Sequence, residues 1–469
     1  MKPFYFIVSF WGEEFREHFL RFSVASLLAP GNVPSLSNRT QSRLIVCTTN
    51  ADWVALQEEP LFDQFVSYVE PVFAELKRPA PAFLKPILLE KYRRGTSCLT
   101  PENGAESDIW ITPDDVFPPE KYKELEAIGR EIGQELMGSH HYALRILFMS
   151  TGHKIGACRA FGDQANAVFL GADLMTSDGT VQELERLMDE GHKVVLTATL
   201  RFAQDECLAA FKEAGHMVPD KPLILQPRQL VSTVFKHLHP ETACFEFDSP
   251  YFCDTATSSL WKVSGDDGVL LHNLNLYPLL VNYEGVETHH ADYFDIGGTI
   301  DGKYIALHFD PQKDITIVAD SDSFMLASFT PRGEYYYPLT TGWRKRHPWV
   351  AERYKTHLIR KTLHGPMGDP VKRHFYTVPI QFHSEDLTTV WTEVEQRAAR
   401  VANRAVAQGG FLDTLLGMSC STISFKTLFS PTNLLSFATR LMKKLPERQQ
   451  HRLKLYVRRR GWLSSEKAN

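Results

Sequence analysis

The sequence predicts an α/β protein in which helices flank a mixed sheet, followed by a helical C-terminal region. Short apolar runs alternate with amphipathic stretches from residue 4 to residue 214, which is the rhythm of βαβ units. Short alternating runs follow from residue 244 onward and indicate further strands. Helical periodicity returns in residues 349–362 and 385–408. In such a protein we expect ligands at the C-terminal ends of parallel strands.

The N-terminal segment contains the first βαβ units. An unbroken apolar run predicts a strand in residues 4–10, and apolar residues at helical spacing predict a helix over residues 13–28. A second strand is expected in residues 43–48, a helix from residue 53, and a third strand in residues 66–71.

The middle of the chain continues this pattern. Helices are expected in residues 121–137, 142–161, 181–190 and 202–214, and strands in residues 167–170 and 193–198. The later strands are expected in residues 244–247, 260–263, 269–281, 315–318 and 324–329.

Length and composition limit the class of protein. The 469 residues are 43% hydrophobic and 23% charged, which is an ordinary balance for a soluble globular protein. We expect a main domain in residues 1–335, a helical extension in residues 336–408 and an amphipathic basic tail in residues 409–469. The formal net charge of -5 argues against nucleic acid as a partner.

The cysteines and apolar runs bear on the compartment. Seven cysteines without a C-x-x-C pair argue against a disulfide framework or a cysteine zinc site, and they favour a reducing cytoplasm. No run reaches the roughly 20 apolar residues that cross a bilayer. We therefore expect a cytoplasmic protein.

Residues 166–180 carry the strongest functional signal. The short apolar run at residues 167–170 leads into Asp173, and Asp178 lies in the turn before the next expected helix. A carboxylate at the end of a central strand is a typical position for a metal or ligand in an α/β protein.

This pattern resembles the metal-binding strand end of nucleotide-sugar glycosyltransferases with the GT-A fold. The resemblance implies a GT-A-like Rossmannoid mixed sheet, with Asp173 holding Mg²⁺ or Mn²⁺ on the donor diphosphate and Asp178 supplying a second oxygen. The family motif is Asp-x-Asp, and here Gly171 stands where the first acid is expected. Alternatively, Asp178 only caps the helix that follows it.

The resemblance extends to the first two strand ends. Residues 9–12 are similar to the nucleotide-facing loop of this superfamily, which implies that Trp11 stacks on a base and that Gly12 lets the backbone approach it. Thr49 and Asp52 stand at the second strand end, where such enzymes bind the base or the ribose. A structural role for Trp11 is the alternative.

The helix expected before residue 166 carries two further candidates. The resemblance implies that His153 and Lys154 point toward the phosphate or the base. The alternative for His153 is a solvent-exposed histidine.

The second half offers a third metal ligand and a base. His272, after an apolar run, is either the third ligand of the metal or an ordinary half-buried strand residue. Inverting transfer needs a carboxylate within reach of the acceptor hydroxyl, and Asp301 among flexible glycines is the first candidate. Asp320 and Asp322 stand behind it, and each of the three is alternatively a turn acid satisfied by the local backbone.

The C-terminal tail differs in kind. Residues 441–463 interleave lysines and arginines with leucine and aromatic side chains, which suits an anionic membrane surface. This would make the enzyme peripheral at the inner face of the plasma membrane and bring it to a lipid-linked acceptor. The alternative is a basic helix that docks on the acidic body of the same protein.

The resemblance implies transfer of a sugar from a nucleotide-sugar donor to a glycan, lipid-linked or small-molecule acceptor. One alternative is a non-catalytic protein that keeps the fold and binds a glycan or membrane partner, which the missing first acid favours. Another is a nucleotidyltransferase on a similar scaffold, which would need a second clustered acid and a lysine or arginine on the phosphates.

Overall fold

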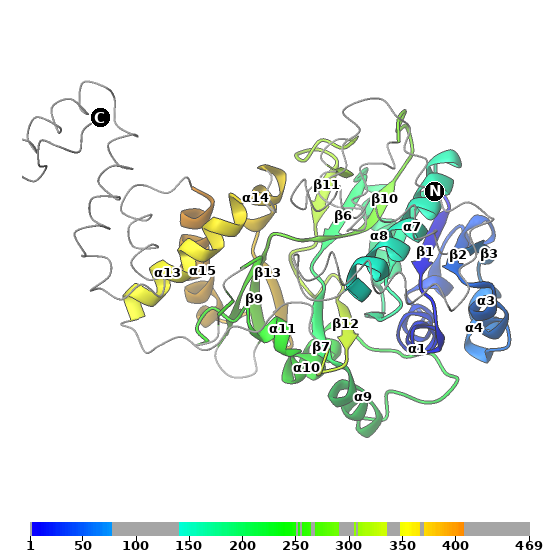
Figure 1. Ribbon diagram of the computed structural model, residues 1–469, viewed down its shortest axis with the longest axis horizontal. Coiled ribbons are helices and arrows are strands. Elements are labelled where there is room, and N and C mark those ends of the chain that lie inside the picture. The colour runs from blue at the N-terminus through cyan, green and yellow to red at the C-terminus, as the bar shows by residue number, and fades with distance from the viewer. Residues whose placement is uncertain are drawn as a thin grey trace, which may run out of the picture. The chain divides into compact units, whose positions relative to one another are not determined.

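The computed structural model describes residues 2–76, 140–249, 252–253, 256–263, 268–289, 304–305, 308–334, 348–365 and 370–407 (Figure 1). The chain divides into two compact units, one of residues 1–347 and 358–408 and one of residues 348–357 and 409–469. This division differs from the expected boundary at residue 335. The reason is that β13 (Ile380–His383) pairs with β9 (Gly268–Asn273), so the later segment is part of the first unit.

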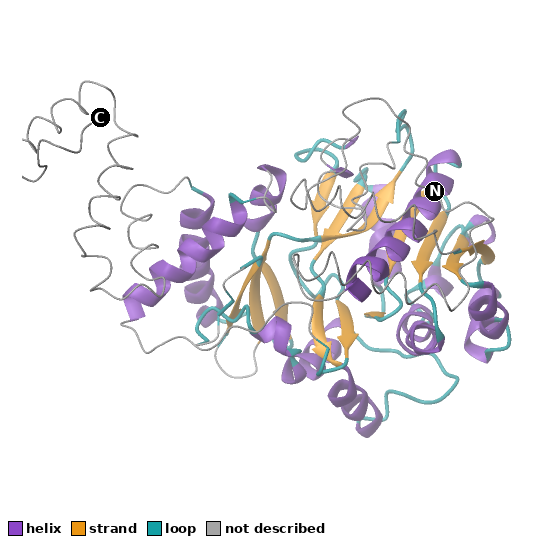
Figure 2. Ribbon diagram, in the orientation of Figure 1, coloured by secondary structure: helices purple, strands orange, loops and turns teal. Residues whose placement is uncertain are grey.

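The largest sheet has seven strands in the order β11-β6-β10-β4-β1-β2-β3. Figure 2 shows strands and helices side by side in this part of the molecule. Only β10 runs antiparallel to its neighbours. The strands are β1 (Phe4–Ser9), β2 (Arg43–Thr48), β3 (Glu70–Glu75), β4 (Asn166–Leu170), β6 (Val194–Thr197), β10 (Tyr277–Asn282) and β11 (Ile315–Ile317). The strand order reverses between β1 and β4, and in open α/β sheets the C-terminal ends of the strands at such a reversal are a common place for ligands. The predicted α/β class with a mixed sheet is confirmed.

Strand β1 lies at the centre of the core because both of its faces are apolar. Phe4, Phe6 and Val8 pack into one buried cluster, while Tyr5 and Ile7 pack into a second cluster on the opposite face. Period-two alternation between two covered faces explains why the strand is an unbroken apolar run.

Helix α7 (His140–Gly162) covers the face of Tyr5 and Ile7 at very short range. A Cβ atom at Gly156 would lie 2.3 Å from Cγ2 of Ile7, and one at Gly152 would lie 2.4 Å from Oγ of Ser9. Only glycine permits this approach, which brings the helix against the C-terminal end of β1.

Two smaller sheets complete the first unit. One contains β5 (Leu174–Thr176), β12 (Leu326–Thr330) and β7 (Leu200–Ala203), and the other contains β13, β9 and β8 (Ser258–Lys262). The remaining α-helices of the described residues are α1 (Glu13–His18), which continues through a π-helical turn (Phe19–Val24) into α2 (Ala25–Leu27), then α3 (Asn50–Leu56), α4 (Pro60–Val66), α8 (Thr180–Asp189), α9 (Gln204–Glu213), α10 (Pro227–Val234), α11 (Pro240–Ala243), α14 (Pro370–Tyr376) and α15 (Thr389–Val406), together with α13 (Pro348–Leu363), whose residues are divided between the two units.

Three expected elements differ from the structure. The single run expected at residues 269–281 is two strands in different sheets, because Asn273 turns the chain by accepting the backbone N–H of Asn275 at 2.9 Å. The third strand begins at Glu70 rather than residue 66, after α4. Residues 244–247 form no strand and instead follow α11. The helix expected at residues 121–137 lies outside the described residues.

Among the helices that the structure describes, none combines the length and the apolar character needed to cross a membrane.

Candidate metal centre

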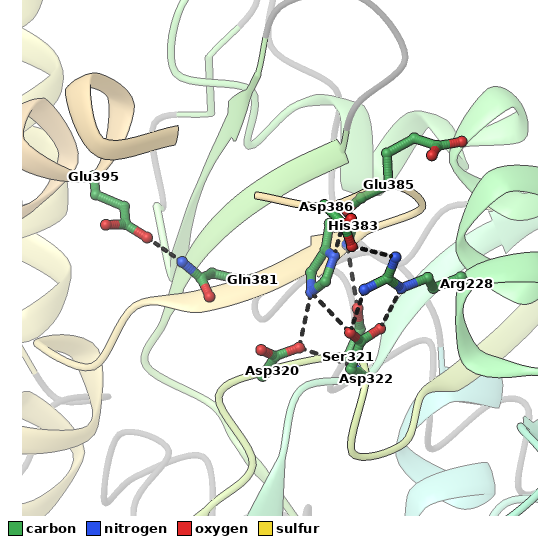
Figure 3. A network of polar contacts seen from close by, with 9 residues as sticks. All are labelled: Arg228, Asp320, Ser321, Asp322, Gln381, His383, Glu385, Asp386 and Glu395. Carbon is green, nitrogen blue, oxygen red and sulfur yellow. Dashed lines mark hydrogen bonds and ion pairs between the residues drawn. The ribbon is translucent and has the colours of Figure 1, made fainter. Parts of the chain in front are cut away.

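Asp320, Asp322 and His383 form a compact group of potential metal ligands (Figure 3). Each offers one ligand atom, and the three atoms lie within 4.8 Å of one another. Within the described ranges of the chain, no other three His, Cys, Asp or Glu side chains meet in this way. The sequence did not predict this metal site. It indicated only Asp320 and Asp322, as candidates for a general base.

Backbone hydrogen bonds attach the two acids to the strand that carries the histidine. After β11 the chain runs alongside β13, where the N–H of Gln381 donates to Ala319 O at 2.8 Å and the N–H of Ser321 donates to Gln381 O at 2.9 Å. The buried hydroxyl of Ser321 then accepts the backbone N–H of His383 at 3.1 Å. The end of β13 is therefore held beside the acids.

The two carboxylates are exposed while the imidazole is buried. The side chains of Asp320 and Asp322 are 45% and 40% exposed, against 2% for His383. The backbone N–H of Asp322 donates to Oδ1 of Asp320 at 2.8 Å, which sets the direction of that carboxylate. The group thus has a buried side and a side open to solvent.

The ring of His383 lies between two acceptors. Nδ1 lies 2.8 Å from the backbone carbonyl oxygen of Glu385, to which a ring N–H can donate. Nε2 lies 2.9 Å from Oδ1 of Asp320 and 3.9 Å from Oδ2 of Asp322. A histidine that donates one ring N–H to a carbonyl and points the other nitrogen at carboxylates has the orientation of a metal ligand.

These distances suit a small divalent cation. With bonds of about 2.0–2.1 Å, two ligand atoms at right angles lie about 2.8–3.0 Å apart and two opposite ligand atoms about 4.0–4.2 Å apart. The separations of 2.9 Å and 3.9 Å between Nε2 of His383 and the two carboxylate oxygens fall between these limits. Two carboxylate oxygens and one imidazole nitrogen leave further coordination positions on the solvent side for water or phosphate, as Mg²⁺ and Mn²⁺ require.

Arg228, at the start of α10, supplies a positive charge beside the acids (Figure 3). Its guanidinium donates two hydrogen bonds to the Asp322 carboxylate, at 2.9 Å and 2.7 Å, and one to Asp386 at 2.8 Å. The hydrogen bond from Arg228 lowers the pKa of Asp322 below its usual value. Three carboxylates and one guanidinium leave a formal charge of -2 when the imidazole is neutral, which one divalent cation would balance.

The structure does not bring the expected metal ligands together. Asp173 follows β4 and is half-buried, and its Oδ2 accepts the hydroxyl of Ser328 at 2.6 Å. His272 lies in the β8–β9–β13 sheet, fully buried, with Nδ1 2.9 Å from Tyr376 O. Within the described residues, Asp173, Asp178 and His272 form no common ligand group. The prediction that these three residues bind one metal ion is therefore wrong. His272 lies apart from the two acids because β9 belongs to a separate sheet.

Asp178 has a structural role. Its Oδ1 accepts the backbone N–H of Gly31 at 2.7 Å, and its Oδ2 accepts Nε2 of Gln226 at 3.2 Å. The left-handed residue Gly179, and not Asp178, precedes α8 directly. The carboxylate therefore links two loops, and the expectation that it caps α8 is also wrong.

Some of the residues near the N-terminus that we expected to contact a nucleotide instead make hydrogen bonds within the protein. The carboxylate of buried Asp52 accepts the backbone N–H of Gly12 at 2.8 Å, the guanidinium of Arg16 at 3.0 Å and the hydroxyl of Thr49 at 2.7 Å. Thr49 also caps α3. Trp11 is half-buried and packs on the second core cluster. Asp52 thus holds the turn after β1 against α3.

His153 and Lys154 are both buried in α7, 1% and 9% exposed. The expectation of an exposed histidine is therefore wrong. Burial lowers the pKa of His153 to about 4, and the nearby backbone of Leu170 offsets this shift only in part. Its ring lies edge-on to Phe169 at 5.4 Å, next to the end of β4. Asp301 and the basic tail lie outside the described residues.

Sequence reasoning missed His383 and Arg228. The two acids could have been found from the sequence, since Asp320-Ser321-Asp322 is a complete Asp-x-Asp motif shortly after the apolar run at residues 315–318. No comparable pattern surrounds His383 or Arg228, which lie more than sixty residues from the acids along the chain.

No protein-family model matches this chain, and no curated protein matches its sequence significantly. The residues of the chain itself are therefore the basis for assigning a function.

Proposed function

We propose that this protein is a metal-dependent glycosyltransferase that moves a sugar from a nucleotide-sugar donor to a glycan, lipid-linked or small-molecule acceptor. The observation that carries the proposal is the Asp320-x-Asp322 pair beside His383, just beyond the end of a parallel strand. In this proposal the pair takes the place of the incomplete motif at Gly171 and Asp173.

The chemistry explains why such a pair is useful. The leaving group of a nucleotide-sugar is a diphosphate, and its negative charge increases as the glycosidic bond breaks. A cation held by one or two carboxylates neutralises this charge and leaves coordination positions for the phosphate oxygens. Arg228 lies beside the proposed cation and presents a planar set of N–H donors that suits phosphate.

The fold supports the same assignment. β11, β4, β1 and β2 all point in one direction, so their C-terminal ends lie along one edge of the sheet. Trp11, Asp173 and Asp320 each follow one of these strand ends. A doubly wound sheet binds its ligand at this edge, which agrees with the GT-A-like Rossmannoid arrangement that the resemblance implies.

The proposal changes the role of Asp320 from a general base to a metal ligand, because its Oδ1 faces Nε2 of His383. Asp301 remains a proposal for the base if the reaction inverts.

The first experiment measures thermal stabilisation of the full chain by UDP-, GDP-, CMP- and dTDP-sugars, with and without Mn²⁺. We expect one nucleotide to stabilise the protein only when Mn²⁺ is present, and Asp322→Asn to abolish this effect. Asp173→Asn is the matched control, since it removes an acid that follows β4 and lies outside the proposed metal group. No response to any nucleotide, or equal loss in both variants, would count against the proposal.

A nucleotidyltransferase is the second candidate, because the second acid and the arginine that this chemistry needs are both next to His383. Product analysis separates the two. A glycosyltransferase releases a nucleoside mono- or diphosphate and glycosylates the acceptor, whereas a nucleotidyltransferase consumes a nucleoside triphosphate and releases pyrophosphate.

A further inference from the structure

Cys244 and Cys253 are held together by a backbone hydrogen bond. The N–H of Cys253 donates to the carbonyl oxygen of Cys244 at 2.9 Å. A carbonyl oxygen lies about 2.4 Å from its own Cα, and a backbone nitrogen about 1.46 Å from its own. The two Cα atoms are therefore at most about 6.8 Å apart, within the range of about 4.4–6.8 Å that disulfides span.

The side chain of Cys253 also lies next to the Cys244 thiol. Its side-chain interaction with Cys244, followed by burial, raises the pKa of Cys244 above its ordinary value. The thiol of Cys244 donates to the carbonyl oxygen of Glu241 at 2.9 Å. Both side chains are nearly buried, at 8% and 6% exposure, and neither cysteine is in a disulfide.

The residues between them hold this arrangement in place. The ring of Phe247 stacks on Trp261 with 4.0 Å between centroids. The carboxylate of Asp248 accepts two hydrogen bonds from Arg397, each 2.9 Å long. These contacts attach the segment to β8 and α15, so the cysteines stay opposite each other in the reduced protein.

We propose that Cys244 and Cys253 form a reversible intramolecular disulfide when the protein meets a low-molecular-weight disulfide such as oxidised glutathione. The inference is independent of the proposed sugar transfer.

The step balances as a thiol–disulfide exchange. One cysteine thiolate attacks the external disulfide, forms a mixed disulfide and releases one glutathione thiolate. The second cysteine thiolate then attacks the protein sulfur of the mixed disulfide and releases the second glutathione. The two protein thiols together lose two electrons and two protons, and the external disulfide is reduced to two thiols. Because burial keeps the thiolate scarce, we expect a slow reaction that needs local opening of the segment.

The test treats the full chain with oxidised glutathione, blocks the remaining thiols and maps the peptides by mass spectrometry. We expect the loss of two thiols per chain, a Cys244–Cys253 cross-linked peptide that dithiothreitol removes, and a higher Tm in the oxidised protein. Cys207→Ser, which changes a buried cysteine of α9, is the matched control and should give the same cross-link.

In Cys244→Ser the cross-link should disappear, and Cys253 should remain free or carry one glutathione. If this variant does not fold, the peptide map of the wild-type protein decides. A wild-type protein that loses thiols without linking Cys244 to Cys253, or that preferentially links other cysteines, overturns the proposal.

Discussion

Nε2 of His383 lies 2.9 Å from Oδ1 of Asp320, while Nδ1 of the same ring lies 2.8 Å from a backbone carbonyl oxygen. Both neighbours are acceptors, so a neutral imidazole satisfies only one of them. A cation bound by both the ring and the carboxylate would satisfy the second contact. This relationship makes the three polar side chains a candidate metal centre.

Removal of the histidine should weaken metal binding. We expect His383→Ala to lower the Mn²⁺ affinity by about tenfold or more, because one of three protein ligands is lost. Isothermal titration calorimetry measures the affinity. Asp173→Asn is the control and should bind Mn²⁺ as the wild type does. An unchanged affinity in His383→Ala would exclude His383 as a ligand.

Arg228 should have opposite effects on the metal and on the nucleotide. Its guanidinium neutralises Asp322, so Arg228→Gln should leave the acids more negative and raise the Mn²⁺ affinity severalfold. The same variant should lose most of the stabilisation by a nucleotide-sugar, because a phosphate donor is missing. Calorimetry and thermal shift measure the two effects. If the Mn²⁺ affinity and the stabilisation by the nucleotide-sugar both rise or both fall, Arg228 does not bind phosphate.

Gly31 should tolerate no side chain. A Cβ atom there would lie 2.7 Å from the backbone nitrogen of Gly179 and 2.8 Å from Oδ1 of Asp178. We expect Gly31→Ala to lower the free energy of unfolding by about 1–3 kcal/mol through overpacking and loss of the Gly31–Asp178 hydrogen bond. Urea denaturation measures this change. Gly333→Ala is the control, since a Cβ atom there meets nothing within 4 Å, and equal effects at both positions would refute the steric explanation.

His153 should make the protein sensitive to acid. Burial lowers its pKa from 6.5 to about 4, so between these values the unfolded chain binds a proton that the native protein does not. The free energy of unfolding that depends on the neutral ring is fully present above pH 6.5 and is lost as the pH falls toward 4. At pH 5 this loss is about 2 kcal/mol. In His153→Leu this loss should be absent, because the variant has no side chain that can bind the proton.

Urea denaturation at pH 7.5 and pH 5 measures the effect. The control His192→Gln changes a half-exposed histidine and should keep the wild-type difference between the two pH values. A wild-type difference that survives in His153→Leu would show that other groups cause the acid sensitivity. His272, buried with its pKa also lowered to about 4, should account for part of the remaining loss.

The sequence by itself determined the class of fold and much of its first half. The apolar run at residues 4–10 predicted the first strand, which is β1 (Phe4–Ser9), and the helix expected over residues 13–28 is found as helical turns from Glu13 to Leu27. The Asp320-x-Asp322 pair was visible as two acids after an apolar run. Patterns of this kind depend on neighbours along the chain, which sequence reasoning can follow.

Only the tertiary structure decided which acids have partners. Asp52 and Asp178 looked like ligand residues, but long-range hydrogen bonds to Gly12 and Gly31 already occupy their carboxylates. His383 meets Asp320 because a bridge between Gln381 and Asp320 brings two distant segments together. The physical reason is that a metal centre requires atoms within a few ångströms, and strand pairing across sixty residues leaves no periodic signal in the sequence.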